Sequence, residues 1–222
     1  MNTLSFSETY TLLLLSSTGK RTDISNPQYS AGIVLGCIYD LLQSGCITMD
    51  INGFLKIQKS LPAEYTYLRD VYNGINQKNK KLSKWLEYYC CNPTSKNIRP
   101  LINSMYYTLS DKGYVNIEVK KGFLKTKTSI YLHSDKITPI LENFQTAVLH
   151  GTDDEHIIFA TQLLLLADVL KNIFSMGQRL KVNSAISDFS KSQIWKNTKP
   201  YINIIRNFNY QNSLNSGAMY SE

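Results

Sequence analysis

Residues 157–176 form the most apolar stretch of the chain, and this stretch places the strongest limit on the fold. Its apolar residues lie around most of a helix circumference, a pattern typical of a helix that other helices surround. Acidic residues at 153–155 precede it and Gly177 follows it, as helix ends favour. Asp168 and Lys171 would be costly inside a bilayer. We therefore expect the central helix of a bundle, with Asp168 either exposed or paired.

The rest of the chain alternates between helix patterns and two hairpin signals. Asn52-Gly53 separates two short strand-like runs at residues 47–57. A second hairpin is expected over residues 114–132, with its tip at 120–128. We predict a mainly α fold, a helical bundle around a central apolar helix with small β-hairpins, as a single domain over residues 1–210 and a polar tail at 211–222. Helices are expected at residues 28–43, 62–78, 82–91, 95–112, 139–150, 180–190 and 192–210, after a helix or strand at 3–15. From the apolar spacing of three of these helices we expect the following residues to face the core: Leu68, Val71, Ile75, Ile98, Leu101, Ile102, Met105, Tyr106, Leu109, Trp195, Ile202, Ile205 and Phe208.

The positive charge of the chain is regional. The whole chain has 24 Lys and Arg, 17 Asp and Glu, and a net charge of +7. Residues 56–127 contain 14 Lys and Arg against 5 Asp and Glu, a local balance of +9, which leaves −2 for the remainder. A regional excess of this kind is typical of a protein that contacts an anionic membrane or a nucleic acid. The alternative is a well-solvated surface.

Catalytic and metal-binding signatures are absent from the sequence. It has no GxSxG, no P-loop and no GxGxxG after a strand, and its carboxylates are dispersed. The cysteines form no CxxC motif and the three histidines are scattered, so we expect no metal site, no cofactor and a reduced, cytoplasmic setting. We do not expect an enzyme. The cysteines are Cys37, Cys46, Cys90 and Cys91.

The predicted tip of the second hairpin combines apolar and basic residues. Phe123 and Leu124 lie at its centre, and each would gain roughly 1.5–3 kcal/mol if buried in an acyl boundary. Each flanking lysine adds about 1 kcal/mol near an anionic surface. We expect reversible membrane contact, with packing on the core or on a second subunit as the alternative. The lysines are Lys120, Lys121, Lys125 and Lys127.

Two other classes of function fit parts of the sequence. A helix followed by a basic hairpin, as in residues 95–132, is also the pattern of a winged helix, and its charge would suit phosphates. The basic residues of that helix are few, namely Lys96, Arg99 and Lys112. A nucleic-acid-binding module is therefore an alternative to membrane binding, although we do not expect nucleic acid as the partner. An oligomerisation scaffold that exchanges the hairpin between subunits is a further alternative.

The order of several segments resembles the Golgi phosphoprotein 3 family and its yeast and bacterial relatives. Together the segments cover residues 6–175. The resemblance implies a mostly helical domain with one projecting hairpin, and in eukaryotic members binding to phosphatidylinositol 4-phosphate, glycosyltransferase tails and a vesicle coat. The segments are ETYTLLLLSSTGK (residues 8–20), GIVLGCIYDLLQSGCITMD (32–50), LSKWLEYY (82–89), IRPLINSMYYTLSDKGYV (98–115) with its hairpin, and LLLLADVLKNIFS (163–175).

Only part of the lipid pocket of eukaryotic members is matched by residues of this chain. Its tryptophan falls at Ser25 and its partner arginine at Val34. Of its two arginines on a later helix, the first matches Arg99 and the second falls at Ile102. The resemblance therefore implies a headgroup site at Arg99, which neighbouring cations would complete. Those cations are Lys96, Lys20 and Arg21.

These patterns lead to one main expectation. The chain would be a prokaryotic-type member without the eukaryotic N-terminal arm, acting as a cytoplasmic adaptor on the cytosolic face of a membrane. It would bind phosphatidylinositol 4-phosphate or another anionic phospholipid through a basic face and the hairpin tip. The hairpin is also expected to permit homo-oligomerisation, as it does in the family.

Overall fold

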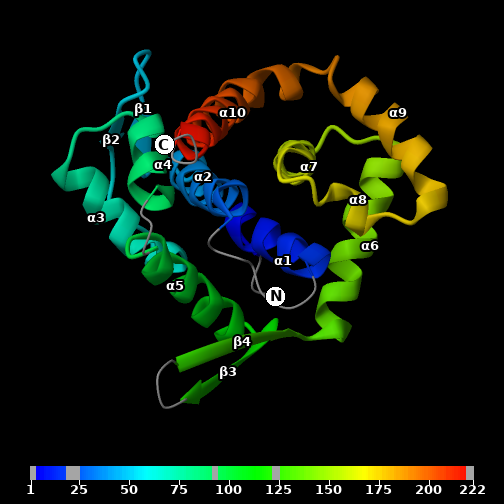
Figure 1. Cartoon of the computed structure of the whole chain (residues 1–222), viewed down its shortest axis with the longest axis horizontal. Coiled ribbons are helices and arrows are strands. Elements are labelled where there is room, and N and C mark those ends of the chain that lie inside the picture. Colours follow the sequence, from blue (N-terminus) through cyan, green and yellow to red (C-terminus); the bar gives the residue numbers. More distant parts are fainter. Residues whose placement is uncertain (1–3, 19–25, 92–94, 122–125, 219–222) are drawn as a thin grey trace. The chain divides into compact units, whose positions relative to one another are not determined.

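The computed structural model describes residues 4–18, 26–91, 95–121 and 126–218, with the backbone alone at 121, 126, 127 and 208–218. The predicted class is confirmed: the fold is mainly α with two small antiparallel hairpins (Figure 1). The Cα positions divide the chain into two compact units. Unit 1 contains residues 1–22 and 105–199, and unit 2 contains residues 23–104 and 200–222.

Unit 1 is built on the helix α1 (Phe6–Thr18), which is buried without interruption from Tyr10 to Leu15. Ser5 and Glu8 form a capping box, because each side chain accepts a hydrogen bond from the backbone N–H of the other. Against α1 pack α6 (Ser134–His150), α7 (Glu155–Leu166) and α8 (Leu170–Ile173). The unit also contains β3 (Val115–Lys121), β4 (Thr126–Leu132), η2 (Met176–Gln178), α9 (Arg179–Phe189) and parts of α5 (Ile98–Asp111) and α10 (Gln193–Ala218).

The prediction of one helix over residues 157–176 is wrong, because helix α7 ends at Leu166. Asp168 adopts a left-handed conformation with φ of 55°. The N–H of Val169 bonds to the carbonyl of Leu164 and that of Asp168 to Leu165, which is the Schellman pattern that closes a helix. Glycine is usual at this position, and a short Asp side chain is among the few that tolerate it. The sequence pattern therefore held no signal of the helix end.

Unit 2 is built on α2 (Pro27–Gln43), which is buried at every position from Ser30 to Leu41. The side chain of Asn26 accepts from the N–H of Gln28, and Pro27 occupies the first helical position. α4 (Leu82–Cys90) and α3 (Arg69–Gln77) pack on α2. The remaining elements are β1 (Ile47–Met49), β2 (Leu55–Ile57), η1 (Ala63–Leu68) and the other parts of α5 and α10.

The predicted apolar faces of the middle helices are confirmed. All of the α3 and α5 positions that we expected inside are buried, and Ile202 and Ile205 of α10 are buried as expected. Trp195 is only half-buried, so its prediction as a core residue is wrong. Phe208 lies where the side chains are not described. The confirmed residues on α3 and α5, with Leu68 just before α3, are Leu68, Val71, Ile75, Ile98, Leu101, Ile102, Met105, Tyr106 and Leu109.

Three boundaries differ from the predictions. The strands of the second hairpin extend to Lys121 and from Thr126, so part of the predicted tip is strand, with Lys120 opposite Lys127. Helix α6 begins at Ser134, which leaves Pro139 inside it rather than at its start. Helix α10 continues to Ala218, past the expected end at 210. Within the described residues, no helix has both the length and the apolarity that crossing a bilayer requires.

Candidate functional site

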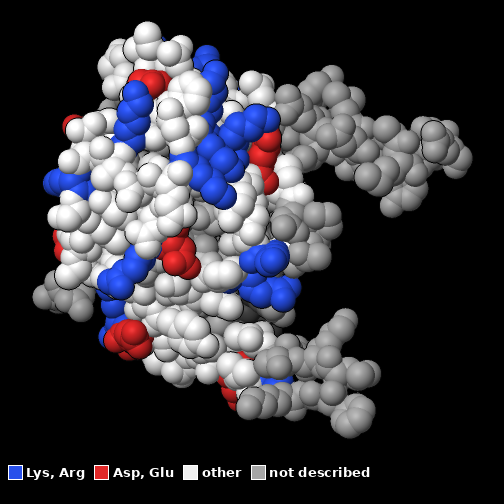
Figure 2. Space-filling model, turned by 90° about the vertical axis from the view of Figure 1, so that its left-hand side faces the viewer, with Lys and Arg blue, Asp and Glu red and all other residues white. Residues whose placement is uncertain are grey.

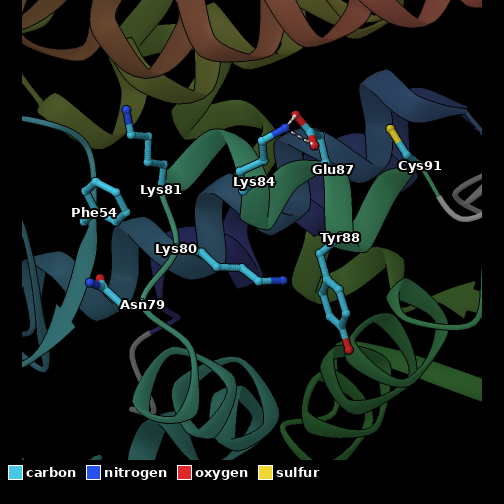
Figure 3. A pocket seen from close by; sticks show the side chains of 8 residues that line it. All are labelled: Phe54, Asn79, Lys80, Lys81, Lys84, Glu87, Tyr88 and Cys91. Atoms are coloured by element: carbon cyan, nitrogen blue, oxygen red, sulfur yellow. Dashed lines mark hydrogen bonds and ion pairs between the residues drawn. The ribbon is translucent and has the colours of Figure 1, made fainter.

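A surface groove of about 720 Å³ lies in unit 2, where the chain passes from α3 into α4. Figure 3 draws the side chains around it, which come from the turn before β2, the link at residues 79–81, α4 and the residue that follows α4. Three of its lining residues are lysines and one is a glutamate, which gives the lining a formal net charge of +2. The lining residues are Phe54, Asn79, Lys80, Lys81, Lys84, Glu87, Tyr88 and Cys91.

Backbone hydrogen bonds hold the lysine-bearing link against the β1–β2 hairpin. The N–H of Leu55 donates to the carbonyl of Lys80 at 3.2 Å, and the N–H of Leu82 donates to Gly53 at 2.8 Å. Between them, Phe54 and Lys81 form an antiparallel bridge. The positions of the lysines are therefore set by secondary structure.

The lysine ammonium groups of the link lie over aromatic rings. Lys80 Nζ is 4.9 Å from the centroid of Tyr88 and 5.2 Å from that of Trp85. Lys81 Nζ is 5.3 Å from the centroid of Phe54. In Figure 3 the Lys80 side chain extends toward Tyr88. Ring faces attract cations, so these contacts hold the ammonium groups in place without cancelling their charge.

Lys80 and Lys81 keep their charge available for a ligand. Among the residues that the structure describes, neither lysine forms an ion pair with a carboxylate. Lys84 differs, because its Nζ lies 2.7 Å from Glu87 Oε2 on the next helical turn. The largest group of Lys and Arg side chains on the face in Figure 2 lies near its centre, with an acidic group beside it.

The indole of Trp85 is buried within unit 2, next to Lys80. Its side chain is 2% exposed, and its Nε1 has no hydrogen-bond partner among the described residues. A Cβ at Gly74 would lie 3.1 Å from the indole ring, so a glycine at this position allows α3 to approach it. The indole therefore presents a fixed face to the ammonium group of Lys80.

The two neighbouring cysteines at the end of α4 have different surroundings. Cys91 is exposed and lines the groove, whereas burial raises the pKa of the Cys90 thiol far above its ordinary value. Burial, and then the nearby Tyr88, raise the pKa of the Tyr89 hydroxyl in the same way. At neutral pH both groups stay protonated, and Cys91 is the accessible thiol of this pair.

The cations predicted around Arg99 lie outside the groove, and their role as a headgroup site stays a prediction. Arg99 and Lys96 are exposed at the start of α5 and do not line the groove. Val34 and Ile102, which occupy two positions of the family pocket, are 0% and 2% exposed and belong to the core. Asn97 links the two regions, since its Nδ2 donates to the carbonyl of Tyr88 at 2.7 Å. Lys20, Arg21 and Ser25 lie outside the described residues.

The predicted hairpin residues are described only in part. Lys120 is exposed and lies 3.4 Å from Glu118, a surface pair of little energetic weight. Lys121 and Lys127 are placed by their backbone in the strands. Phe123, Leu124 and Lys125 lie outside the described residues. Their role at a membrane stays a prediction.

The groove was not predicted from the sequence, in which residues 79–81 only separate two expected helices. A signal was present: lysines at 78, 80, 81 and 84 are followed directly by aromatic residues at 85 and 88. Basic residues this close in sequence to aromatic ones favour cation–π pairs. Phe54 has no such signal, because it is brought to the link by the β1–β2 hairpin.

A smaller cavity of about 230 Å³ in unit 1 is a weaker candidate. It lies between the end of α7 and the start of α8, beside α9. Its Asp168 and Lys171 are both exposed and pair with each other at 2.7 Å, in agreement with the expectation that Asp168 is exposed or paired. Within the described ranges, no three His, Cys, Asp or Glu side chains are placed to share a metal ion.

The chain matches no model of a protein family, and it matches no curated protein sequence. The resemblance to the Golgi phosphoprotein 3 family therefore remains a prediction from the residues quoted above.

Proposed function

We propose that this protein binds anionic phospholipids at the surface of a membrane, as a peripheral protein on its cytosolic face, through the groove of unit 2. The observation that carries the proposal is the pair Lys80 and Lys81, held over aromatic rings and free of ion pairs among the described residues. Each lysine close to an anionic surface contributes about 1 kcal/mol to binding.

The arrangement of the rings favours lipid over nucleic acid. Proteins that bind single strands stack successive bases on open aromatic faces. Here Lys80 and Lys78 lie over Tyr88, and Lys81 lies over Phe54. A lipid headgroup needs the ammonium groups and an apolar border, which this arrangement supplies without moving a side chain.

Phosphatidylinositol 4-phosphate is the specific lipid that the family resemblance implies. Its monoester phosphate would offer more negative charge to Lys80 and Lys81 than a phosphodiester does. The family clamp does not support this specificity, because Val34 and Ile102 are buried apolar residues. We therefore propose the anionic class first and the phosphoinositide as a finer hypothesis within it.

Vesicle flotation tests the proposal. Binding is measured on neutral vesicles, on vesicles with phosphatidylserine, and on vesicles with phosphatidylinositol 4-phosphate at equal surface charge. We expect binding to both anionic membranes, weakened about 30-fold or more in Lys80→Glu/Lys81→Glu, since two favourable contacts of about 1 kcal/mol each are removed and replaced by repulsion. A preference for the phosphoinositide at equal charge would support the finer hypothesis.

The matched control carries the same change of charge elsewhere. Lys196 and Lys199 are exposed on α10, so Lys196→Glu/Lys199→Glu alters net charge equally without touching the groove. We expect this control to lose only a few-fold in affinity. Equal losses in both variants would reduce the effect to net charge, and equally weak binding to neutral and anionic vesicles would contradict the proposal.

Cys91 provides a second readout that needs no mutation. It is exposed and lines the groove, so a maleimide should label it quickly in the free protein. We expect anionic vesicles to slow this labelling and neutral vesicles to leave it unchanged. Protection by single-stranded nucleic acid instead of vesicles would favour the alternative class of partner.

A further inference from the structure

Ile51 is the most exposed of the large apolar side chains that the structure describes. Its relative exposure is 101%, so it has no protein surface against it. It lies at the tip of the β1–β2 hairpin, between Asp50 and Asn52. Tight turns usually carry polar residues at such positions, because an apolar side chain there gains nothing from the fold.

The turn around Ile51 is built by its neighbours. The Asp50 carboxylate accepts from the backbone N–H groups of Asn52 and Phe54 at 2.9 and 3.0 Å. The N–H of Gly53 donates to the carbonyl of Asp50 at 2.9 Å, and Gly53 has φ of 81°. The side chain of Ile51 takes no part in these bonds. Its outward position is therefore a fixed property of the hairpin, independent of its side chain.

The same hairpin borders the basic groove. Phe54 lines the groove, and its neighbours Gly53 and Leu55 bond to the lysine-bearing link. At the tip, Asp50 lies 3.5 Å from Lys56, so the acidic residue nearest Ile51 is compensated by a cation. Ile51 thus belongs to the same hairpin that carries Phe54 and is hydrogen-bonded to the link with Lys80 and Lys81, so an apolar tip and a cationic groove are joined by one element.

We propose that Ile51 inserts into the acyl boundary of the same anionic membrane whose headgroups occupy the groove. This inference rests on the proposed function and adds a contact that gives the protein a fixed orientation on the bilayer. The positive border favours an anionic bilayer, and a single apolar side chain is far smaller than the buried core of a stable protein interface. The β1–β2 hairpin then acts as a wedge beside the headgroup site.

Fluorescence of Ile51→Trp on vesicles tests the insertion directly, after subtraction of the wild-type signal from its two tryptophans. We expect a blue shift on phosphatidylserine vesicles and quenching by lipids brominated on their acyl chains. Gln58→Trp is the matched control, since Gln58 is exposed on the same hairpin just beyond β2 and away from the tip. We expect the added indole of this control to stay unquenched.

Affinity gives an independent measure. Ile51→Ser should weaken vesicle binding about tenfold, since part of the gain from burying an isoleucine is lost, whereas Ile51→Leu should bind like the wild type. Neither change touches the turn network, so both variants are expected to fold.

The outcomes separate this inference from the proposed function. If the protein binds vesicles normally but the indole at position 51 is not quenched, insertion is disproved and the proposed headgroup site is unaffected. Absence of binding to any vesicle would overturn both. A blue shift that depends on protein concentration and needs no vesicles would mean a contact with a second copy, and would also overturn insertion.

Discussion

The two β-hairpins of this chain differ in what supports them. In the β1–β2 hairpin the strands are three residues long, and a hydrogen-bonded turn carries Ile51 outward. In the β3–β4 hairpin the strands are seven residues long, and side-chain burial decreases along the strand from Val115, at 1% exposed, to Val119, at 48%. The short hairpin is closed by a hydrogen-bonded turn, and the long one is buried at its base.

The base of the long hairpin contains the most buried ion pair that the structure describes. Lys112, just before β3, lies 2.6 Å from Glu8 Oε1, and their side chains are 17% and 1% exposed. Glu8 also caps α1 through Ser5. Lys112 thus joins the start of the hairpin to α1. A substitution of Lys112 should therefore lower the stability of unit 1.

The largest effect on stability is expected for Lys112→Met. This change leaves Glu8 buried without its cation, which typically costs about 3–5 kcal/mol. Urea unfolding followed by circular dichroism measures the loss. The same substitution in the short hairpin, Lys56→Met, removes an exposed pair at 3.5 Å and should change stability very little. Equal effects of the two variants would contradict the contrast between base and turn.

The next effect concerns the tip of the long hairpin. If the predicted contact of Phe123 and Leu124 with the membrane is correct, Phe123→Asp/Leu124→Asp should weaken vesicle binding by about 3 kcal/mol, roughly a hundredfold. Flotation measures this beside Ile51→Ser. A loss confined to Ile51→Ser would assign membrane contact to the short hairpin alone, and unchanged binding in the double variant would disprove the prediction for the long one.

A smaller effect is expected from Gly53→Ala in the short turn. Gly53 has φ of 81° and nothing lies within 4 Å of a Cβ at this position, so the cost is backbone strain of about 1 kcal/mol. Thermal unfolding gives the change. Gly177→Ala is the control, since it also has open space but no positive φ, and it should not destabilise the protein. Equal values for the two alanine variants would show that the turn tolerates a side chain.

The smallest effect is the response of the short turn to acid. The N–H of Phe54, with a lesser contribution from that of Asn52, lowers the pKa of the Asp50 carboxyl below its ordinary value of 3.8. A lowered pKa in the folded state stabilises the turn above the unfolded-state pKa, and this stabilisation is lost as the pH falls through the folded value. NMR titration of Asp50 measures the pKa. A value at or above 3.8 would contradict the role of these N–H groups.

Much of the architecture was predictable from the sequence, because it depends on local patterns. The buried face of α5 follows from its apolar spacing, and the β1–β2 turn from Asn52-Gly53. The helix end at Leu166 was not predictable in the same way. It depends on Asp168 in a conformation that glycine usually takes.

The groove was less predictable, because its parts come together only through tertiary contacts. The lysines of the link and the aromatic residues of α4 are close in sequence, but Phe54 reaches them through strand pairing. The family resemblance implied a site at Arg99, Val34 and Ile102, but Val34 and Ile102 are core residues. The exposure of Ile51 was not predictable, since the exposure of a single apolar residue cannot be inferred from its neighbours in sequence.

The contact between Lys80 and Trp85 has an optical consequence. An ammonium group 5.2 Å from a buried indole shifts the emission of that indole through its electric field. An anion bound beside Lys80 would change this field, while the indole stays fixed against Gly74. The emission of Trp85 is therefore expected to report whether an anion occupies the proposed site.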